Sequence, residues 1–326
     1  MSMILPTKSL YYNDVNLIAQ PSKINSRSEV PRELNKIIVS PMASVIGIEF
    51  AQKATELGLT VCLHRFCEAF EQLNIYNQLS NKENIYISIG LNDWDRVSIL
   101  EEGGVKNWLI DIANGYLPGI PKTIDRLMRF CKPNKVMIGN VMTKEGIELY
   151  KDYGKIFNGE FYIRVGIGGG NCCATSDMTG YNRGQITELI ECFEYADQYD
   201  IKIVADGGIK NSNYAAKAFG AGSDYVMMGS YFSKAKEAHT HIIGDGTYWG
   251  GSTYKQQELY GGIKKHSEGK VVKVEGELKP LEELVSELWG GLSSAISYSG
   301  YKTLTEFVGN GIFEIKQNSL PPGNRK

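Results

Sequence analysis

The sequence predicts a single (β/α)8 TIM barrel with an N-terminal arm and a long flap after strand 8. Eight short segments rich in Val, Ile and Tyr alternate along the chain with stretches of helical apolar spacing. The eight segments are mostly apolar on both faces, as the strands of a buried parallel sheet are. Eight evenly spaced units favour a closed barrel over the main alternative, a doubly wound open sheet. The length of 326 residues is compatible with one such barrel.

The elements are expected in a regular order. Residues 1–36 form the arm, and residues 37–302 form the barrel with its flap. The eight expected strands span residues 37–42, 60–65, 85–91, 108–115, 135–141, 161–168, 201–208 and 225–230. Helices are expected between the strands, for example over 48–57, 185–199 and 213–219. Four glycines stand where a helix should stop, namely Gly58, Gly103, Gly154 and Gly220.

The segment after the eighth strand is long, polar and rich in glycine. A connection of the length of 231–280 inside a compact domain is usually a functional lid or disordered. Its Tyr and Trp residues favour a lid, and we expect the flap over about 243–280. Residues 281–302 then form a closing helix, and residues 303–326 form a C-terminal tail.

The composition excludes several classes of protein. Lys and Arg number 35 against 37 Asp and Glu, so no basic excess indicates nucleic-acid binding. No window approaches 18 uncharged apolar residues, so we expect no membrane span. The first residues lack the features of a signal peptide, which predicts a cytoplasmic location. The 6 cysteines are scattered and expected to be reduced, and the 4 histidines are too spread for a metal cluster.

Polar and glycine residues follow most of the expected strands. In a barrel the C-terminal ends of the strands meet on one face, where the active site lies. Turn chemistry alone would explain any one of these stretches, but it does not readily explain all of them together. The stretches are 41–44, 64–65, 111–114, 140, 166–173, 206–208 and 229–230.

The loop 166–173 is the most specific of these stretches. Its four glycines permit positive φ and a close backbone approach, so carbonyls can face a monovalent cation and amides an anion. A cysteine at the end of this loop is placed to be a nucleophile, although most intracellular cysteines are packing residues. Barrels also bind phosphate in the loops after strands 7 and 8. Backbone N–H groups and one hydroxyl are available there from Gly207, Gly208, Gly229 and Ser230. Asp206 suits ribose hydroxyls unless it serves as a helix cap.

Taken together, these motifs resemble the IMP dehydrogenase and GMP reductase family. The resemblance extends over about residues 11–298. It is carried by the glycine loop with its cysteine, ADGG at 205–208, MGS at 228–230, DIANG at 111–115, GNV at 139–141 and NSRSEV at 25–30. It implies that Cys173, rather than Cys172, attacks C2 of a purine nucleotide to form a thioimidate. It also implies a nicotinamide cofactor.

Two features favour the reductase branch of this family. Only residues 66–84 separate strands 2 and 3, where the dehydrogenase usually carries a regulatory insert. The dehydrogenase uses an arginine–tyrosine pair on its flap, yet no arginine occurs between Arg183 and Arg325. Thr175 and Glu268 instead match the threonine–glutamate pair by which the reductase protonates departing ammonia.

The resemblance therefore implies NADPH-dependent reductive deamination of GMP to IMP and ammonia by a cytoplasmic homotetramer. Two alternatives remain, an IMP dehydrogenase without the insert and a catalytically inactive barrel that binds purine nucleotides. A nicotinamide absorbance assay distinguishes the three.

The same resemblance implies further site residues. The implied substrate contacts are Met42, Ser44, Asn140, Asn171, Asp206, Gly207, Gly208, Gly229, Ser230, Gly250, Gly251, Ser252, Ser267 and Gly269. The implied cofactor contacts are Arg65, Asp111, Ala113, Asn114, Lys265, Ser294 and Ser297, the two serines across a subunit boundary. Potassium is implied at the backbone of Gly168, Gly170 and Cys173. One departure is Asn171, which stands where the family has a phosphate-binding serine.

Overall fold

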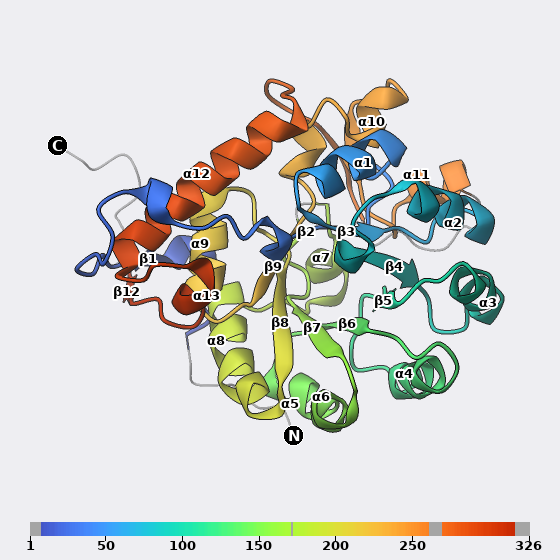
Figure 1. Ribbon diagram of the computed structural model, residues 1–326, viewed down its shortest axis with the longest axis horizontal. Helices are drawn as coiled ribbons and strands as arrows, with labels where there is room; N and C mark the ends of the chain where they lie inside the picture. Colours follow the sequence, from blue (N-terminus) through green and yellow to red (C-terminus); the bar gives the residue numbers. More distant parts are fainter. Residues whose placement is uncertain (1–7, 171, 261–268, 317–326) are drawn as a thin grey trace.

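The protein folds as a closed eight-stranded parallel barrel surrounded by helices (Figure 1). The computed structural model describes residues 8–170, 172–260 and 269–316. The barrel strands pair in chain order, and the last strand closes the barrel by pairing with the first. They are β2 Ile37–Val39, β3 Thr60–Leu63, β4 Ile85–Ile89, β5 Asn107–Ile110, β6 Lys135–Val141, β7 Glu160–Val165, β8 Ile201–Asp206 and β9 Tyr225–Met228. The predicted fold class is thereby confirmed.

Helices follow the strands around the outside of the barrel. They are α1 Ile48–Glu56, α2 Ala69–Gln78, α3 Trp94–Glu102, α4 Gly119–Phe130, α5 Lys144–Glu148, α6 Lys151–Ile156, α7 Thr175–Thr179, α8 Gln185–Ala196, α9 Ser212–Gly220 and α12 Leu281–Ser299. Gly103 caps α3 as expected. Gly154, however, lies inside α6, because its lack of a side chain lets α6 pack closely on the carbonyl of Tyr199.

Each barrel strand contributes one side chain to an apolar layer in the interior. The layer comprises Ile38, Cys62, Tyr86, Leu109, Met137, Tyr162, Val204 and Met227. Side chains of a strand alternate between two faces, so the residues two positions further along belong to the next interior layer. Six of those residues are polar or charged, namely Ser40, His64, Ser88, Asp111, Arg164 and Asp206. A polar layer therefore sits on the apolar one at the C-terminal ends of the strands.

The arm and the C-terminal segment lie together. Strand β1 Val15–Leu17 of the arm pairs antiparallel with β12 Phe313–Ile315, which follows the short helix α13 Leu304–Phe307. Both segments lie beside α9 and α12 at the edge of the barrel (Figure 1). The part of the expected tail that the structure describes thus contains regular structure.

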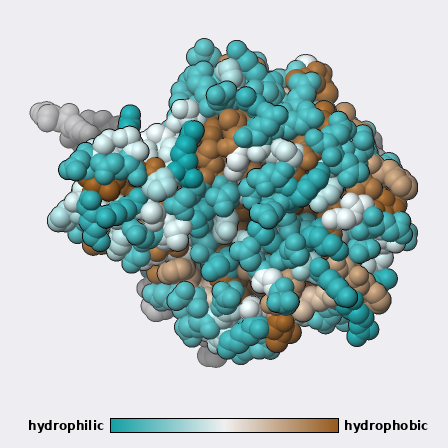
Figure 2. Space-filling model, viewed as in Figure 1, coloured by the Kyte–Doolittle hydropathy of each residue, from teal (hydrophilic) through white to brown (hydrophobic). Residues whose placement is uncertain are grey.

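The flap segment also contains regular structure. Strands β10 Thr247–Trp249 and β11 Val271–Lys273 form an antiparallel hairpin, with α10 His239–Ile242 before it and α11 Tyr254–Tyr260 between its strands. No helix in the described part of the chain is long and apolar enough to cross a bilayer. Hydrophilic side chains cover most of the face in Figure 2, with apolar ones in separate groups.

Candidate active site

A cavity of about 370 Å³ opens at the C-terminal ends of the barrel strands. Cavities that bind small molecules typically have volumes of about 300–1,000 Å³. Its walls come from the loops after β2, β3, β5, β7, β8 and β9 and from the flap. Residues far apart in the sequence therefore meet in one place, as the fold class requires.

Cys173 and Thr175 line this cavity. Cys173 is half-buried, whereas the neighbouring Cys172 is buried and its pKa is raised to about 11 by that burial. A thiol with such a pKa remains protonated near neutral pH, and the thiolate is the nucleophilic form. Although Cys172 also lines the cavity, its environment is therefore less suited to a nucleophile than that of Cys173. Thr175 begins α7, so its position relative to Cys173 is set by the start of that helix.

The end of the flap is joined to the cysteine loop. Gly269 forms an antiparallel β-bridge with Cys173, and the Lys270 amide donates a hydrogen bond to the Cys172 carbonyl at 2.8 Å. The Lys270 ammonium also pairs with Asp177 of α7. These contacts hold the start of β11 against the loop that carries Cys173. Glu268 lies outside the described residues, and Gly269 is the residue that follows it in the chain.

The glycine loops after β7 and β8 are in direct contact. Gly166 has a φ of +132°, and a Cβ at this position would lie 2.0 Å from the Asp206 carbonyl oxygen. A Cβ on Gly169 would likewise lie 2.0 Å from Nε2 of Gln185. A side chain at Gly166 would collide with the backbone of Asp206, so the contact between the two loops requires glycine there.

The floor of the cavity holds a buried cluster of charges centred on Arg164. The Arg164 guanidinium lies 3.1 Å from Asp111 and 3.6 Å from Asp206, and its side chain is 5% exposed. Asn140 donates to Asp206 at 2.8 Å and to the Gly166 carbonyl at 2.7 Å. Burial raises the pKa of Asp206, while Arg164 and Asn140 oppose this effect. The cluster fixes two carboxylates, one directly after β5 and one at the end of β8, against the same guanidinium.

Arg65 and Phe66 form the part of the cavity wall that lies against Gly251 of the flap. The Arg65 guanidinium lies 5.2 Å from the centroid of the Phe66 ring, and its Nε is buried without a hydrogen-bond partner among the described residues. A Cβ on Gly251 would lie 2.2 Å from the Phe66 ring, so this ring packs directly on the flap backbone. An unpaired buried donor in a cavity fits a polar ligand, because leaving it unpaired costs free energy.

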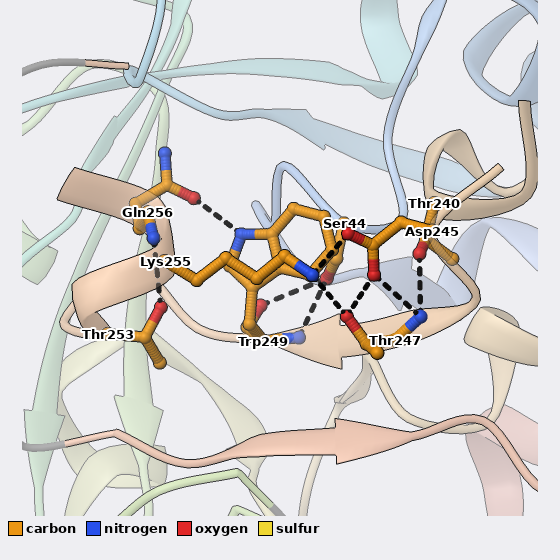
Figure 3. A network of polar contacts seen from close by, with 8 residues as sticks. All are labelled: Ser44, Thr240, Asp245, Thr247, Trp249, Thr253, Lys255 and Gln256. Carbon is orange, nitrogen blue, oxygen red and sulfur yellow. Dashed lines mark hydrogen bonds and ion pairs between the residues drawn. The ribbon is translucent and has the colours of Figure 1, made fainter. Parts of the chain in front are cut away.

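A polar network fastens the flap hairpin to the barrel (Figure 3). The Trp249 indole donates a hydrogen bond to Gln256 at 2.9 Å. The Lys255 ammonium lies 4.6 Å from the centroid of the Trp249 ring. Lys255 also pairs with Asp245. The hydroxyl of Ser44 donates to the Trp249 carbonyl at 2.9 Å. Ser44 is thus fully buried in this network and does not line the cavity.

The structure brings most of the expected site residues together. Those that line the cavity are Met42, Arg65, Asp111, Ala113, Asn140, Gly168, Gly170, Cys173, Thr175, Asp206, Gly207, Gly208, Gly229, Ser230, Gly250, Gly251 and Ser252. Asn114 instead accepts a hydrogen bond from the Tyr116 amide, and Ser294 and Ser297 lie on α12 away from the cavity. Asn171, Lys265, Ser267 and Glu268 lie outside the described residues.

The sequence reasoning missed several cavity residues, among them Arg164, Phe66 and Tyr248. Arg164 carried a usable signal, because a charge inside an apolar strand needs a partner. Phe66 and Tyr248 carried none, since aromatic residues are common in loops and cores alike. Tyr248 donates its hydroxyl to the Met42 sulfur at 2.9 Å.

Comparisons with known proteins agree with this geometry. The family model described as "IMP dehydrogenase / GMP reductase domain" matches residues 9–320. The chain belongs to the IMP dehydrogenase/GMP reductase family. Both activities in the family name are oxidoreductase activities.

Curated members of the IMP dehydrogenase/GMP reductase family are similar to the chain over most of its length. A GMP reductase of Buchnera aphidicola (strain Tuc7) is 31% identical, with 83% of this chain and 80% of the relative covered. GMP reductases of Onchocerca volvulus and Serratia proteamaculans are each 29% identical. The similarity to the Onchocerca volvulus protein covers 93% of this chain and 90% of that protein. The similarity to the Serratia proteamaculans protein covers 92% of each chain.

Proposed function

We propose that the protein is a GMP reductase that converts GMP to IMP and ammonia with NADPH. The observation that carries this proposal is the β-bridge between Cys173 and Gly269. It joins the half-buried cysteine of the cavity to the flap residue that follows Glu268 in the sequence. The similarity to curated GMP reductases supports the same reaction.

In the proposed reaction the Cys173 sulfur adds to C2 of the guanine ring. The bond from C2 to the exocyclic nitrogen then breaks, and Thr175 with Glu268 delivers a proton so that the nitrogen leaves as ammonia. The product of these steps is a thioimidate on Cys173. A hydride delivered to C2 reduces it, and the thiolate departs to leave IMP. Asp206 would accept hydrogen bonds from the ribose, and Gly208 and Ser230 would bind the phosphate, since all three line the cavity.

The cofactor NADPH would supply that hydride when bound. The cavity fits a polar ligand at Arg65, whose buried Nε has no partner in the described part of the chain. Asp111 and Ala113 line the same side and would orient the nicotinamide. Lys265 is proposed as a further contact, and Ser294 and Ser297 of α12 as contacts to the cofactor of a neighbouring subunit in a homotetramer. Asn114 is less suited, since its carbonyl oxygen is engaged by Tyr116.

A potassium ion is proposed at the backbone carbonyls of Gly168, Gly170 and Cys173. Backbone oxygens are the ligands that such hard cations take. The Cys173 amide donates to the Gly170 carbonyl at 3.0 Å, so these two residues already form one tight turn. The ion would support the position of the nucleophile.

The alternative reaction, oxidation of IMP, is less well supported by the sequence of the flap. A dehydrogenase must activate water, and the chain has no arginine from Arg183 to Arg325 that could do so. The described flap cation closest to the cysteine loop is Lys270, which is paired with Asp177. An inactive barrel is disfavoured because Cys173, Thr175 and Glu268 are all present.

The test measures nicotinamide absorbance with GMP plus NADPH and, separately, with IMP plus NAD+. We expect NADPH oxidation in the first assay and negligible NAD+ reduction in the second. The variant Glu268→Gln should slow the first reaction by about 10²–10⁴-fold, the usual effect of removing an acid–base partner. Glu258→Gln, in the exposed part of α11, is the matched control. Robust formation of XMP from IMP would show that the protein is a dehydrogenase. Absence of activity in both assays would favour the inactive barrel.

A further inference from the structure

A second cavity adjoins the catalytic cavity. Its volume is about 320 Å³, which again falls in the range of ligand sites. It shares Gly168, Gly169, Gly208 and Ser230 with the catalytic cavity, so the loops after β7, β8 and β9 bound both spaces. The other lining residues are Tyr11, Tyr12 and Asn13 of the arm, Asn182 and Gln185 near the start of α8, and Lys210 and Tyr214 near the start of α9.

The charge of this second cavity suits an anion. Its described lining contains one cation, Lys210, and no carboxylate. The Lys210 ammonium lies 5.1 Å from the centroid of the Tyr214 ring and makes no hydrogen bond or ion pair with the described residues. An unpaired cation near hydrogen-bond donors attracts phosphate, for which lysine is a common point-charge ligand.

Neutral donors surround the cation. Tyr12 is 3% exposed, and its hydroxyl has no hydrogen bond to any described residue. Burial raises the pKa of Tyr12, so the hydroxyl remains a donor. The Gln185 amide packs against Gly169, which lines both cavities. Tyr12 and Gln185 thus offer donors next to Lys210 and next to the catalytic cavity.

The arm wall of the second cavity is held in place without a ligand. The Lys217 ammonium donates to the Tyr12 carbonyl at 3.0 Å, and Tyr214 donates its hydroxyl to Asn13. The Leu10 amide donates to Thr187 of α8 at 2.8 Å. A site formed in advance binds with a smaller entropy cost than one that must order.

We propose that the second cavity holds the β-phosphate of a purine nucleoside 5′-diphosphate, so that the enzyme binds GDP more tightly than GMP. This inference rests on the proposed function, which places the first phosphate at Gly208 and Ser230. Because both residues also line the second cavity, a second phosphate joined to the first enters the space that contains Lys210.

The experiment measures binding of GMP and of GDP by calorimetry, with NADPH oxidation on GMP measured in parallel. The full chain is compared with Lys210→Gln, with Lys210→Arg, and with Lys122→Gln. Lys122 is an exposed lysine of α4 outside both cavities and is the matched control. We expect wild-type protein to bind GDP at least about 10-fold more tightly than GMP, the effect of about 1.4 kcal/mol. Lys210→Gln should abolish that preference with little change for GMP, and Lys210→Arg should retain it.

Several results would overturn the inference. One is that GDP binds no more tightly than GMP, and another is that Lys210→Gln weakens both ligands equally. Inorganic phosphate and pyrophosphate are added to test for a separate oxyanion. Pyrophosphate should compete with GDP. If phosphate or pyrophosphate binds alongside GMP in a Lys210-dependent manner while GDP shows no preference, the cavity holds a separate oxyanion and the inference is wrong. Absence of GMP turnover would instead count against the proposed function, because the GDP preference is read from binding alone.

Discussion

Gly269 of the flap pairs with Cys173 of the loop after β7 in an antiparallel β-bridge. The next residue, Lys270, continues the contact through its amide to the Cys172 carbonyl. The position of the flap is therefore coupled to that of the cysteine, since displacement of one backbone breaks its contact with the other. This relationship makes the flap part of the active site.

The variant Gly269→Ala should separate these two backbones. Its Cβ would lie 2.5 Å from the Thr253 methyl group and 3.3 Å from the Ser252 hydroxyl, so Gly269 must shift. We expect kcat/KM with GMP to fall by about 10²-fold, the scale of a small misplacement of catalytic groups. Gly290→Ala in α12 is the control, because its Cβ meets no atom within 4 Å. Equal kcat/KM values in the two variants would show that the bridge is dispensable.

The two adjacent cysteines should behave differently. Cys173→Ala is expected to abolish turnover while nucleotide binding survives, since the half-buried cysteine of the cavity is lost. Cys172→Ala should retain turnover and lose about 1 kcal/mol of stability through reduced packing. Alkylation with iodoacetamide followed by mass spectrometry should modify Cys173 first, because burial raises the pKa of Cys172 to about 11. If activity survives in Cys173→Ala but not in Cys172→Ala, then Cys172 and not Cys173 is the nucleophile.

Removal of Arg164 should destabilise the protein. The variant Arg164→Met leaves Asp111 and Asp206 beside each other without their buried cation. Loss of one partner of a buried pair typically costs about 3–5 kcal/mol. Chemical denaturation measures this loss, and Arg27→Met, which removes an exposed arginine bonded to Ser294, should cost less than about 1 kcal/mol. Similar losses in both variants would mean that the cluster contributes little to stability.

Glu188 should make the stability of the protein depend on pH. It is 1% exposed, and burial raises its pKa from 4.5 to about 8 despite the opposing effect of Arg183. Between these values the folded state holds a proton that the unfolded state has released, so the contribution of Glu188 to stability is greatest below pH 4.5 and falls as the pH rises to 8. The slope is up to about 1.4 kcal/mol per pH unit.

The variant Glu188→Gln should remove this pH dependence. Relative to the wild-type protein, its melting temperature should therefore rise progressively from about pH 5 to pH 8. Glu191→Gln is a useful contrast, since Arg183 lowers the pKa of Glu191 by hydrogen bonding. If the melting temperatures of the wild-type and Glu188→Gln proteins change in parallel from about pH 5 to pH 8, the prediction is wrong.

The eight barrel strands could be predicted from the sequence because their signal is local. Each is a short apolar run, and a strand alternates its side chains without reference to its neighbours. The expected strand 135–141 coincides with β6, but the other seven extended too far at their C-terminal ends, for example 108–115 against Asn107–Ile110. The polar residues there leave the sheet to form the rim of the site, and a count of apolar residues does not show where the last ladder hydrogen bond falls.

The cysteine loop and the glycines that line the cavity could be identified from the sequence, since their motifs are contiguous. Which distant residues meet could not, because that depends on the folded packing. Closure of the barrel places Arg164 between Asp111 and Asp206, and the flap hairpin places Gly269 on Cys173. The same packing removes Ser44 from the cavity and commits it to Trp249. A motif specifies which chemical groups are present, whereas their distances depend on the packing of strands and loops that are far apart in the chain.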